Sequence, residues 1–170
     1  MTLVFRPEQA GDVAAIHRLN AAAFKTAAEA RLVDALRANS ALNLSVVALA
    51  DDAVIGHIAF SPVTIESEGA TFAGVGLGPM AVDPLRQREG IGGRLIRDGL
   101  ERLRAAGHEI CVVLGHADYY PRHGFVRAKP LGICWENPVP DDVFFVQELR
   151  PGALDGVTGV VRYRPEFAAV

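Results

Sequence analysis

The N-terminal part of the chain combines one short strand pattern with two helical patterns. The segment 2–6 has the alternating character of a strand. Asp12, a residue type that favours helix N-caps, precedes apolar positions spaced three and four residues apart, and a second such face follows. The two faces consist of Val13, Ile16, Leu19, Ala23 and Phe24, and of Ala30, Val33 and Leu36. The pattern predicts a strand followed by two helices.

Three longer apolar segments come next and are separated by short polar turns. We predict strands over 44–50, 54–66 and 70–82. The connections Asp51-Asp52 and Ser67-Glu68-Gly69 are short enough for tight turns. Because short turns join antiparallel neighbours, these strands are expected to form an antiparallel meander.

The second half of the chain begins with an amphipathic helix and a further strand. Over 92–106 the apolar residues lie on one helical side and the charged residues on the other, and Gly107 suits the C-terminal end. A strand over 109–114 follows. A strand–helix–strand unit after a meander predicts a mixed sheet in which only the later part is a right-handed parallel crossover. Further elements are expected as a helical turn near 119–123 and strands near 143–149 and 159–163.

Length and composition favour one packed domain over residues 1–170. Half of the 170 residues are apolar and 22% are charged, which is too hydrophobic for a disordered chain. Charged residues interrupt the N-terminus early, and the longest uncharged stretch, 69–82, is shorter than the roughly 20 residues of a membrane helix. We therefore expect a soluble, cytoplasmic protein. Cys111 and Cys134 lack metal-ligand spacing, so they are interpreted as reduced thiols and no metal is expected.

Positive charge is concentrated in one short window. The whole chain carries a net charge of −3, which gives no general attraction to nucleic acid or to an anionic membrane. Within 86–97, four arginines stand against the single acid Glu89, a local net charge of +3. This window is expected to bind an anion.

A glycine-rich loop, 87–93, lies in the same window, between a predicted strand and a predicted helix. Gly90, Gly92 and Gly93 allow a ligand to approach the backbone, and the first N–H groups of a helix attract phosphate. Tight packing of the helix on the sheet is the structural alternative. A P-loop is disfavoured because no hydroxyl residue follows Gly93, and a dinucleotide-binding loop is disfavoured because Leu114 stands where an acid is expected.

The loop and its surroundings resemble the GNAT superfamily of acyl-CoA-dependent N-acyltransferases. The segment 87–92 matches the signature Gln/Arg-x-x-Gly-x-Gly/Ala, the strand 77–82 precedes it, and 120–125 is similar to the family's Tyr-x-x-x-Gly-Phe. The resemblance implies an α/β (α+β mixed sheet) GNAT-like fold, with an antiparallel meander followed by a parallel β-α-β crossover at a splayed central strand pair. It implies an N-acetyltransferase that transfers an acetyl group from acetyl-CoA to a primary amine by direct attack in a ternary complex.

The same resemblance assigns the cofactor site. Main-chain amides of the loop are expected to hold the pyrophosphate, and the preceding strand is expected to pair with the pantetheine arm. Met80 or Ala81 would donate a main-chain N–H to the oxyanion. Pro79 fits such a site, because proline cannot donate to a ladder and marks a break between strands. The implied cofactor-binding residues are Met80, Ala81, Val82, Gln87, Arg88, Glu89, Gly90, Ile91, Gly92 and Gly93.

Tyr120 is the expected general acid, because a phenol can protonate the leaving thiolate and the family's tyrosine at this position has that role. Its neighbour Tyr119 fits the spacing less well. The general base is left open, with His116 and Asp118 best placed in sequence. His57 and Glu66 are further candidates, although a structural role is the favoured interpretation for His57.

Two departures from the family pattern concern the segment before Tyr120. Val113 occupies a position where many members carry asparagine, and the connection 115–118 is shorter than theirs. The run 112–120, together with 144–149 and 151–154, does resemble a bacterial subgroup of predicted acetyltransferases.

Alternatives remain for both the activity and the acceptor. A non-catalytic acyl-CoA-binding sensor is the rival function, and a covalent acyl-enzyme is disfavoured because Cys111 falls in a buried strand pattern. A small-molecule amine is the preferred acceptor, ahead of a peptide N-terminus and a protein lysine. The first two helices and the segment 134–143 are expected to line the acceptor side. A homodimer through the apolar strand 144–146 is considered as well.

Overall fold

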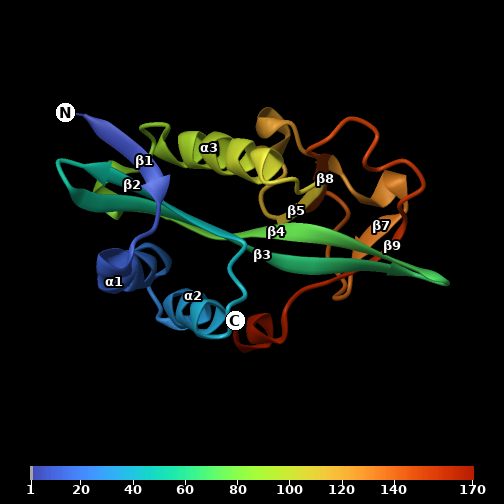
Figure 1. Ribbon diagram of the computed structural model, residues 1–170, viewed down its shortest axis with the longest axis horizontal. Helices are drawn as coiled ribbons and strands as arrows, with labels where there is room; N and C mark the ends of the chain where they lie inside the picture. The colour runs from blue at the N-terminus through green and yellow to red at the C-terminus, as the bar shows by residue number, and fades with distance from the viewer. Residues whose placement is uncertain (1) are drawn as a thin grey trace. The chain divides into compact units, whose positions relative to one another are not determined.

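The computed structural model describes residues 2–170, which divide into two compact units (Figure 1). Unit 1 contains residues 2–61, 78–99 and 165–170, and unit 2 contains residues 62–77 and 100–164. Two long strands and one helix contribute residues to both units. The expectation of a single domain over 1–170 therefore stays a prediction.

Unit 1 is built on the meander that the sequence predicts. Its elements are β1 (Leu3–Pro7), α1 (Val13–Phe24), α2 (Ala28–Ala38), β2 (Leu44–Ala50), the first part of β3 (Ala53–Ser67), the last part of β4 (Ala70–Val82) and the first part of α3 (Ile91–Ala105), with short 3-10 turns at Ala10–Asp12, Pro84–Arg86 and Pro165–Ala169. β1 pairs with β2 and β2 pairs with β3, both antiparallel. Asp51 and Asp52 have φ values of 48° and 68°, the left-handed conformation that a two-residue hairpin turn requires.

Helices cover both faces of the unit 1 strands. Successive side chains of β3 point to opposite faces, so neighbouring residues of this strand contact different helices. A Cβ atom at Gly56 would lie 3.0 Å from Leu95 Cδ1, so this position faces α3. The next residue, His57, contacts Asn20 of α1 on the opposite face. α1 and α2 therefore lie on one face and α3 on the other, as Figure 1 shows.

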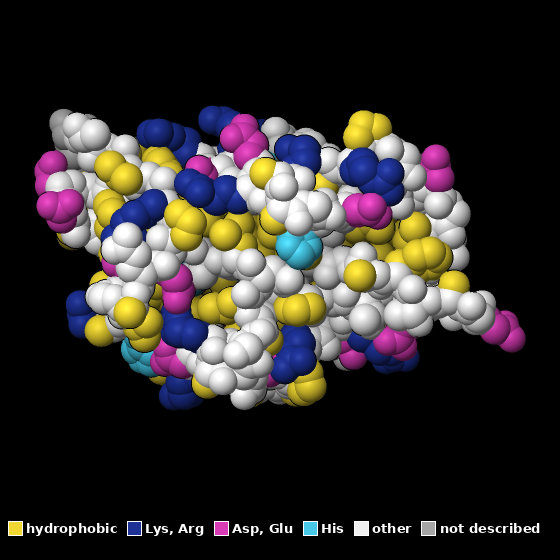
Figure 2. All heavy atoms as spheres, viewed as in Figure 1, with side chains coloured by type: hydrophobic (Ala, Val, Ile, Leu, Met, Phe, Trp, Pro, Cys, Tyr) yellow, Lys and Arg dark blue, Asp and Glu magenta, His cyan; other side chains and the backbone are white. Residues whose placement is uncertain are grey.

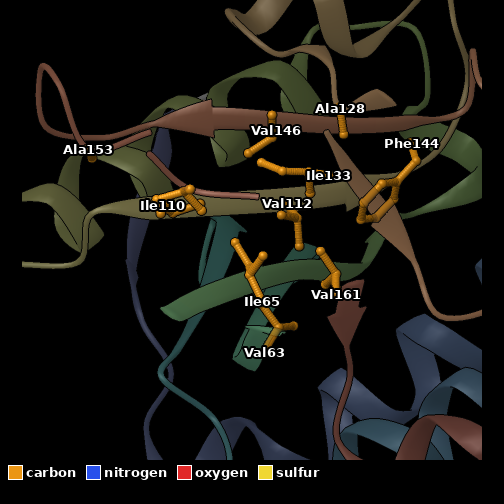
Figure 3. Packing of buried hydrophobic residues seen from close by; sticks show 11 residues of the cluster. Val63, Ile65, Ile110, Val112, Ala128, Ile133, Phe144, Val146, Ala153 and Val161 are labelled. Carbon is orange, nitrogen blue, oxygen red and sulfur yellow. The ribbon is translucent and has the colours of Figure 1, made fainter. Parts of the chain in front are cut away.

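Unit 2 contains the parallel crossover and the rest of the sheet. Its further elements are β5 (Ile110–Leu114), β6 (Val126–Arg127), β7 (Ile133–Trp135), β8 (Phe144–Glu148) and β9 (Gly159–Arg162), with 3-10 turns η3 (Tyr120–His123) and η4 (Lys129–Leu131). β4 and β5 are parallel, β8 pairs antiparallel with β5 and β6, and β9 pairs with β3 and β7. Figure 3 shows the apolar core on this sheet, in which Val112, Ile133 and Phe144 pack together.

The pairing of β4 with β5 ends just before Pro79, although β4 itself continues to Val82. The parallel register runs from Val75↔Cys111 to Leu77↔Val113. Gly78 follows with a φ of +135°, and the Gly78–Pro79 peptide bond is cis. Proline has no N–H that could join a β-ladder. The end of the β4–β5 pairing therefore falls where the sequence predicts it.

The expected mixed sheet, meander and parallel crossover are all present, and two local expectations are wrong. The strand 144–146 is no dimer edge, because β8 lies between β5 and β6 and these three residues are buried. Asp12 stands directly before α1 without capping it, since its carboxylate accepts hydrogen bonds from Arg6 and from the Gln9 N–H. Short strands β6 and β7 were not predicted. No helix within residues 2–170 has the length and apolar character to cross a membrane.

We predict that Gly99→Ala destabilises the protein by about 1–2 kcal/mol. A Cβ atom there would lie 2.6 Å from Cε2 of the fully buried Phe60, so the overpacking cost falls in the upper part of its usual range, about 2–3 kcal/mol, and is offset by about 1 kcal/mol of helix propensity. Gly11→Ala is the control, because nothing lies within 4 Å of a Cβ at that position. Chemical denaturation measures both. Unchanged stability of Gly99→Ala contradicts tight packing of α3 on Phe60.

Candidate active site

The loop before α3 leaves main-chain N–H groups available at the helix N-terminus. The Arg94 N–H donates to the Gly90 carbonyl at 3.2 Å, which is the first hydrogen bond of the helix. The N–H groups of Gly92 and Gly93 come before it and therefore have no carbonyl partner within the helix. Gly90 has no side chain that could cap them, and its φ of +81° is the left-handed conformation that glycine tolerates. Arg88 also has a positive φ, of 65°. The loop thus curls below an open helix end, which is an anion-binding geometry.

Side-chain contacts hold this loop in place and define what its residues offer a ligand. Arg86 donates to both carboxylate oxygens of Glu89 at 3.2 Å, and Gln87 Nε2 donates to the Val82 carbonyl. Ile91 is 1% exposed and its side chain packs at Gly56, so only its main chain can serve a ligand. Figure 2 shows basic side chains on the surface around α3, and the basic residues of this helix are all arginines. Within the positive window 86–97, Glu89 thus neutralises part of the charge through Arg86, and the window keeps a net positive charge for an anionic ligand.

The two proposed oxyanion donors on β4 point in opposite directions. The Asp83 N–H donates to the Ile55 carbonyl on β3 at 2.8 Å. Successive N–H groups of a strand point to opposite edges, so the N–H of Ala81 points toward β3 and the N–H of Met80 points away from it. Met80 is therefore the better candidate for a ligand on the open edge of β4.

Tyr120 is nearly buried at the start of η3. Its ring packs edge-on against Phe125 and Tyr119, at centroid distances of 5.8 and 5.1 Å. It also lies against Gly115, where any Cβ atom would overlap the ring. Burial raises the pKa of Tyr120 to about 12, with Tyr119 and Cys111 adding smaller contributions. The hydroxyl therefore keeps its proton at neutral pH and can act as a donor.

The candidate bases fall into three different environments. His116 and Asp118 are exposed in the loop between β5 and η3, next to Tyr120 in the sequence, and the Tyr119 N–H donates to the His116 carbonyl. Glu66 lies on β3, where hydrogen bonds from Thr64 and Arg162 lower the pKa of its carboxyl group. A lowered pKa makes Glu66 a weaker base. His57 is fully buried.

His57 belongs to a buried hydrogen-bond network whose members lie far apart in the sequence. Its Nε2 lies 2.8 Å from Ser45 Oγ, and its Nδ1 lies 3.2 Å from Asn20 Nδ2. Ser45 in turn bonds to the carboxylate of Glu8, which Arg37 holds at 2.7 and 2.9 Å. Because a carboxylate only accepts, the serine proton goes to Glu8, and His57 must donate from Nε2 and accept at Nδ1. The histidine is thereby held neutral, which supports the structural interpretation.

Cys111 and Val113 both lie in the buried strand β5. Cys111 is fully buried, and burial raises the pKa of its thiol, which keeps the sulfur protonated. Val113 is 1% exposed in β5, so the family's asparagine is replaced here by a core side chain. Within residues 2–170, no three His, Cys, Asp or Glu side chains gather in a metal-binding group.

A crossover helix with an open N-terminus, joining two parallel strands whose pairing ends early, is the arrangement of an acyl-CoA N-acyltransferase fold. A family model described as an acetyltransferase (GNAT) domain matches residues 4–128. The chain belongs to this GNAT acetyltransferase family. The predicted family, fold class and enzyme class, an acetyl-CoA-dependent N-acyltransferase, are therefore confirmed.

Relatives support the same assignment along the whole chain. The uncharacterized N-acetyltransferase YhbS of Escherichia coli K12 is 36% identical over 166 residues, covering 97% of this chain and 98% of that protein. The crystal structure of E. coli YhbS in complex with CoA is similar with a TM-score of 0.92, covering 98% of this chain and 92% of that one. A GNAT acetyltransferase from Brucella melitensis in complex with acetyl-CoA is 42% identical, with a TM-score of 0.81 and 98% of both chains covered.

The buried, neutral His57 predicts an acid-dependent loss of stability. Burial lowers its pKa from 6.5 to about 4, so below pH 6.5 the unfolded chain binds a proton that the folded chain does not. The free energy of unfolding should therefore fall by up to about 3 kcal/mol between pH 6.5 and 4 from this residue alone. Urea denaturation across this range measures it. His57→Gln should flatten the profile and His108→Gln should not; equal slopes in both variants contradict the network.

Proposed function

We propose that this chain transfers the acetyl group of acetyl-CoA directly to a primary amine in a ternary complex. The observation that carries the proposal is the open N-terminus of α3. Gly90 has no side chain that could cap it, so the N–H groups of Gly92 and Gly93 are available to a ligand. The relatives solved with CoA and with acetyl-CoA, at 36% and 42% identity, support the same ligand here. In this proposal the loop 87–93 holds the pyrophosphate, and the segment 80–82 pairs with the pantetheine arm.

The reaction forms one C–N bond and breaks one C–S bond. The amine nitrogen attacks the thioester carbonyl carbon, and the Met80 N–H donates to the carbonyl oxygen as it becomes an oxyanion. When the intermediate collapses, the thiolate leaves and Tyr120 donates its proton to the sulfur. Since the pKa of Tyr120 is raised to about 12, its first contribution is a hydrogen bond that stabilises the developing thiolate. The ammonium proton leaves to His116 or Asp118, directly or through water.

A small-molecule amine is the proposed acceptor, and a cytoplasmic location is proposed with it. A peptide N-terminus or a protein lysine is the second choice. The rival function, a sensor that binds acyl-CoA without turnover, makes a different prediction in a thiol-release assay with a panel of amines. Tight acetyl-CoA binding without thiol release for any amine would favour the sensor.

Tyr120→Phe is predicted to lower kcat by roughly 10- to 10⁴-fold and to leave acetyl-CoA affinity nearly unchanged. The substitution removes the proton donor and keeps the ring that packs on Gly115 and Phe125. Thiol release under saturating substrate measures kcat, and calorimetry measures affinity. The loss should shrink with a thioester whose thiol is more acidic, because a better leaving group needs less protonation.

Tyr119→Phe is the matched control for this experiment. Tyr119 is adjacent in sequence and also has a pKa raised by burial, yet it lies outside the Tyr-x-x-x-Gly-Phe spacing. It should keep kcat near the wild-type value. Wild-type kcat in Tyr120→Phe, under conditions where chemistry limits the rate, contradicts the general-acid assignment.

Gly92→Val is predicted to weaken acetyl-CoA binding by roughly 10-fold or more without unfolding the protein. A branched side chain in the first turn of α3 would occupy the space that the pyrophosphate needs beside the N–H groups. Gly11→Val serves as the control, since its surroundings are open and it lies outside the loop. Calorimetric titration with acetyl-CoA gives both affinities. If folded Gly92→Val binds as tightly as wild type, the loop glycines have a packing role instead.

A further inference from the structure

The residue that follows β5 is a glycine whose backbone conformation does not require one. Gly115 comes directly after Leu114, the last residue of β5, and its φ lies outside the left-handed region that favours glycine. Its N–H donates to the Val143 carbonyl at 2.8 Å, which continues the pairing of β5 with the chain that leads into β8. Alanine could adopt this backbone conformation, so the reason for a glycine lies in the space around it.

The space over Gly115 is filled by the ring of Tyr120. A Cβ atom at Gly115 would overlap Cε2 of this ring and would lie 2.8 Å from Cδ2 and 3.2 Å from Cζ. These distances are shorter than the separation of about 3.5–4.0 Å at which carbon atoms attract one another. Cζ is the atom that carries the phenol oxygen. The missing side chain at 115 therefore sets how closely the phenol can approach the end of β5.

Three aromatic side chains surround the rest of the Tyr120 ring. Tyr119 and Phe125 pack against it edge-on. Phe145 of β8, the strand next to β5, packs against it at a centroid distance of 6.3 Å, with the ring planes tilted by 38°. Together with Gly115 these side chains form what we call the Tyr120 socket. Because the socket is occupied on several sides, the ring has little freedom to move within it.

Backbone hydrogen bonds hold the two segments that meet in this socket. On one side, Gln147 of β8 donates from Nε2 to the His123 carbonyl in η3 at 2.9 Å. On the other side, the bond to Val143 holds the main chain of Gly115. A side chain added at 115 would have to break one of these bonds or rotate the Tyr120 side chain. Rotation leaves both bonds intact, so the ring and its hydroxyl are what moves.

We propose that Gly115 is a positioning residue for the Tyr120 hydroxyl, which meets the leaving sulfur because position 115 carries no side chain. The inference rests on the proposed function, in which Tyr120 donates to that sulfur. Gly115 itself touches no substrate and acts only through the ring. Proton donation depends on hydrogen-bond distance, and a misplacement of about 1 Å can lower a rate on the order of 100-fold.

Gly115→Ala is the direct test. It should lower kcat by roughly 10- to 100-fold and leave the affinity for acetyl-CoA nearly unchanged, because it moves a proton donor and leaves the loop before α3 intact. Thiol release at saturating substrates measures kcat, and calorimetry measures affinity. Gly99→Ala is the matched control. A Cβ atom at Gly99 also meets an aromatic ring, that of Phe60, so this variant should lose stability and keep kcat.

A double-mutant cycle with Tyr120→Phe separates positioning from a general loss of structure. Phenylalanine keeps the ring, so the overlap with an alanine at 115 is the same in both backgrounds and only the hydroxyl differs. Gly115→Ala should therefore destabilise both proteins equally in thermal unfolding. It should lower kcat in the Tyr120 background and change it by less than about twofold in the Tyr120→Phe background.

A further variant keeps the test decisive if Gly115→Ala does not fold. Phe145→Leu reduces one wall of the socket and gives the displaced ring room. The combination of Gly115→Ala with Phe145→Leu should fold, and its kcat should still be roughly 10-fold or more below that of Phe145→Leu alone, because the hydroxyl remains displaced. Equal kcat in these two proteins overturns the inference.

Titration of the Tyr120 phenol gives a readout that needs no acetyl transfer. Burial raises the pKa of Tyr120 to about 12, so a ring displaced from its socket toward water should have a pKa closer to 10. Absorbance after rapid mixing to alkaline pH measures the ionisation. Subtracting the matching Tyr120→Phe protein isolates this phenol from the other two tyrosines.

The outcomes distinguish this inference from the proposed function. Wild-type kcat in Gly115→Ala, or equal losses in both backgrounds of the cycle, overturns the inference and leaves the general-acid role of Tyr120 standing. Wild-type kcat in Tyr120→Phe contradicts that role and overturns the inference with it. If the wild-type protein releases no thiol with any amine, the proposed function is wrong. A lowered pKa of Tyr120 in Gly115→Ala then still supports the placement of the phenol by Gly115, and an unchanged pKa overturns it.

Discussion

The organising constraint of the proposed site is the end of the β4–β5 pairing at Gly78–Pro79. A strand in a sheet normally uses its N–H and C=O groups in ladders on both edges, and those groups are then closed to ligands. Here the parallel register with β5 extends to Leu77, and proline removes a donor two residues later. Beyond it, the N–H of Met80 points away from β3. The proposed oxyanion donor is thus a main-chain group that is available because the pairing of β4 with β5 has already ended.

A related feature is that the proposed cofactor site consists largely of main-chain groups. At α3 the available donors are N–H groups of the first turn, while Ile91 is packed in the core and Glu89 is bonded to Arg86. Side chains around the loop fix its shape and its positive charge. For this reason the spacing of the glycines was enough to predict the cofactor. The side chains of the same segment do not predict which amine is the acceptor.

Local patterns in the sequence predicted the long elements well. The limits of β2 and β4 agree with the apolar segments 44–50 and 70–82, because each segment is bounded by polar turns. β6 and β7 escaped prediction, since strands of two or three residues have no measurable period and owe their pairing to β8 and β9. The His57 network joins Glu8, which follows β1, with one residue each from α1, α2, β2 and β3. The network depends on contacts between segments, which spacing along the chain does not show.

The hydrogen bonds around His57 also tie the orientation of the Asn20 amide to the protonation state of His57 Nδ1. Among the described residues, Asn20 Oδ1 is buried without a hydrogen-bond partner, while its Nδ2 donates to His57 Nδ1 and to the Ile16 carbonyl. Once Nδ1 carries a proton, it can only donate, and the group that must face it is an acceptor. The amide of Asn20 cannot turn to supply that acceptor without placing Oδ1 against the Ile16 carbonyl, which its Nδ2 now serves. The orientation of Asn20 in the core of unit 1 thus holds the His57 ring in its neutral form.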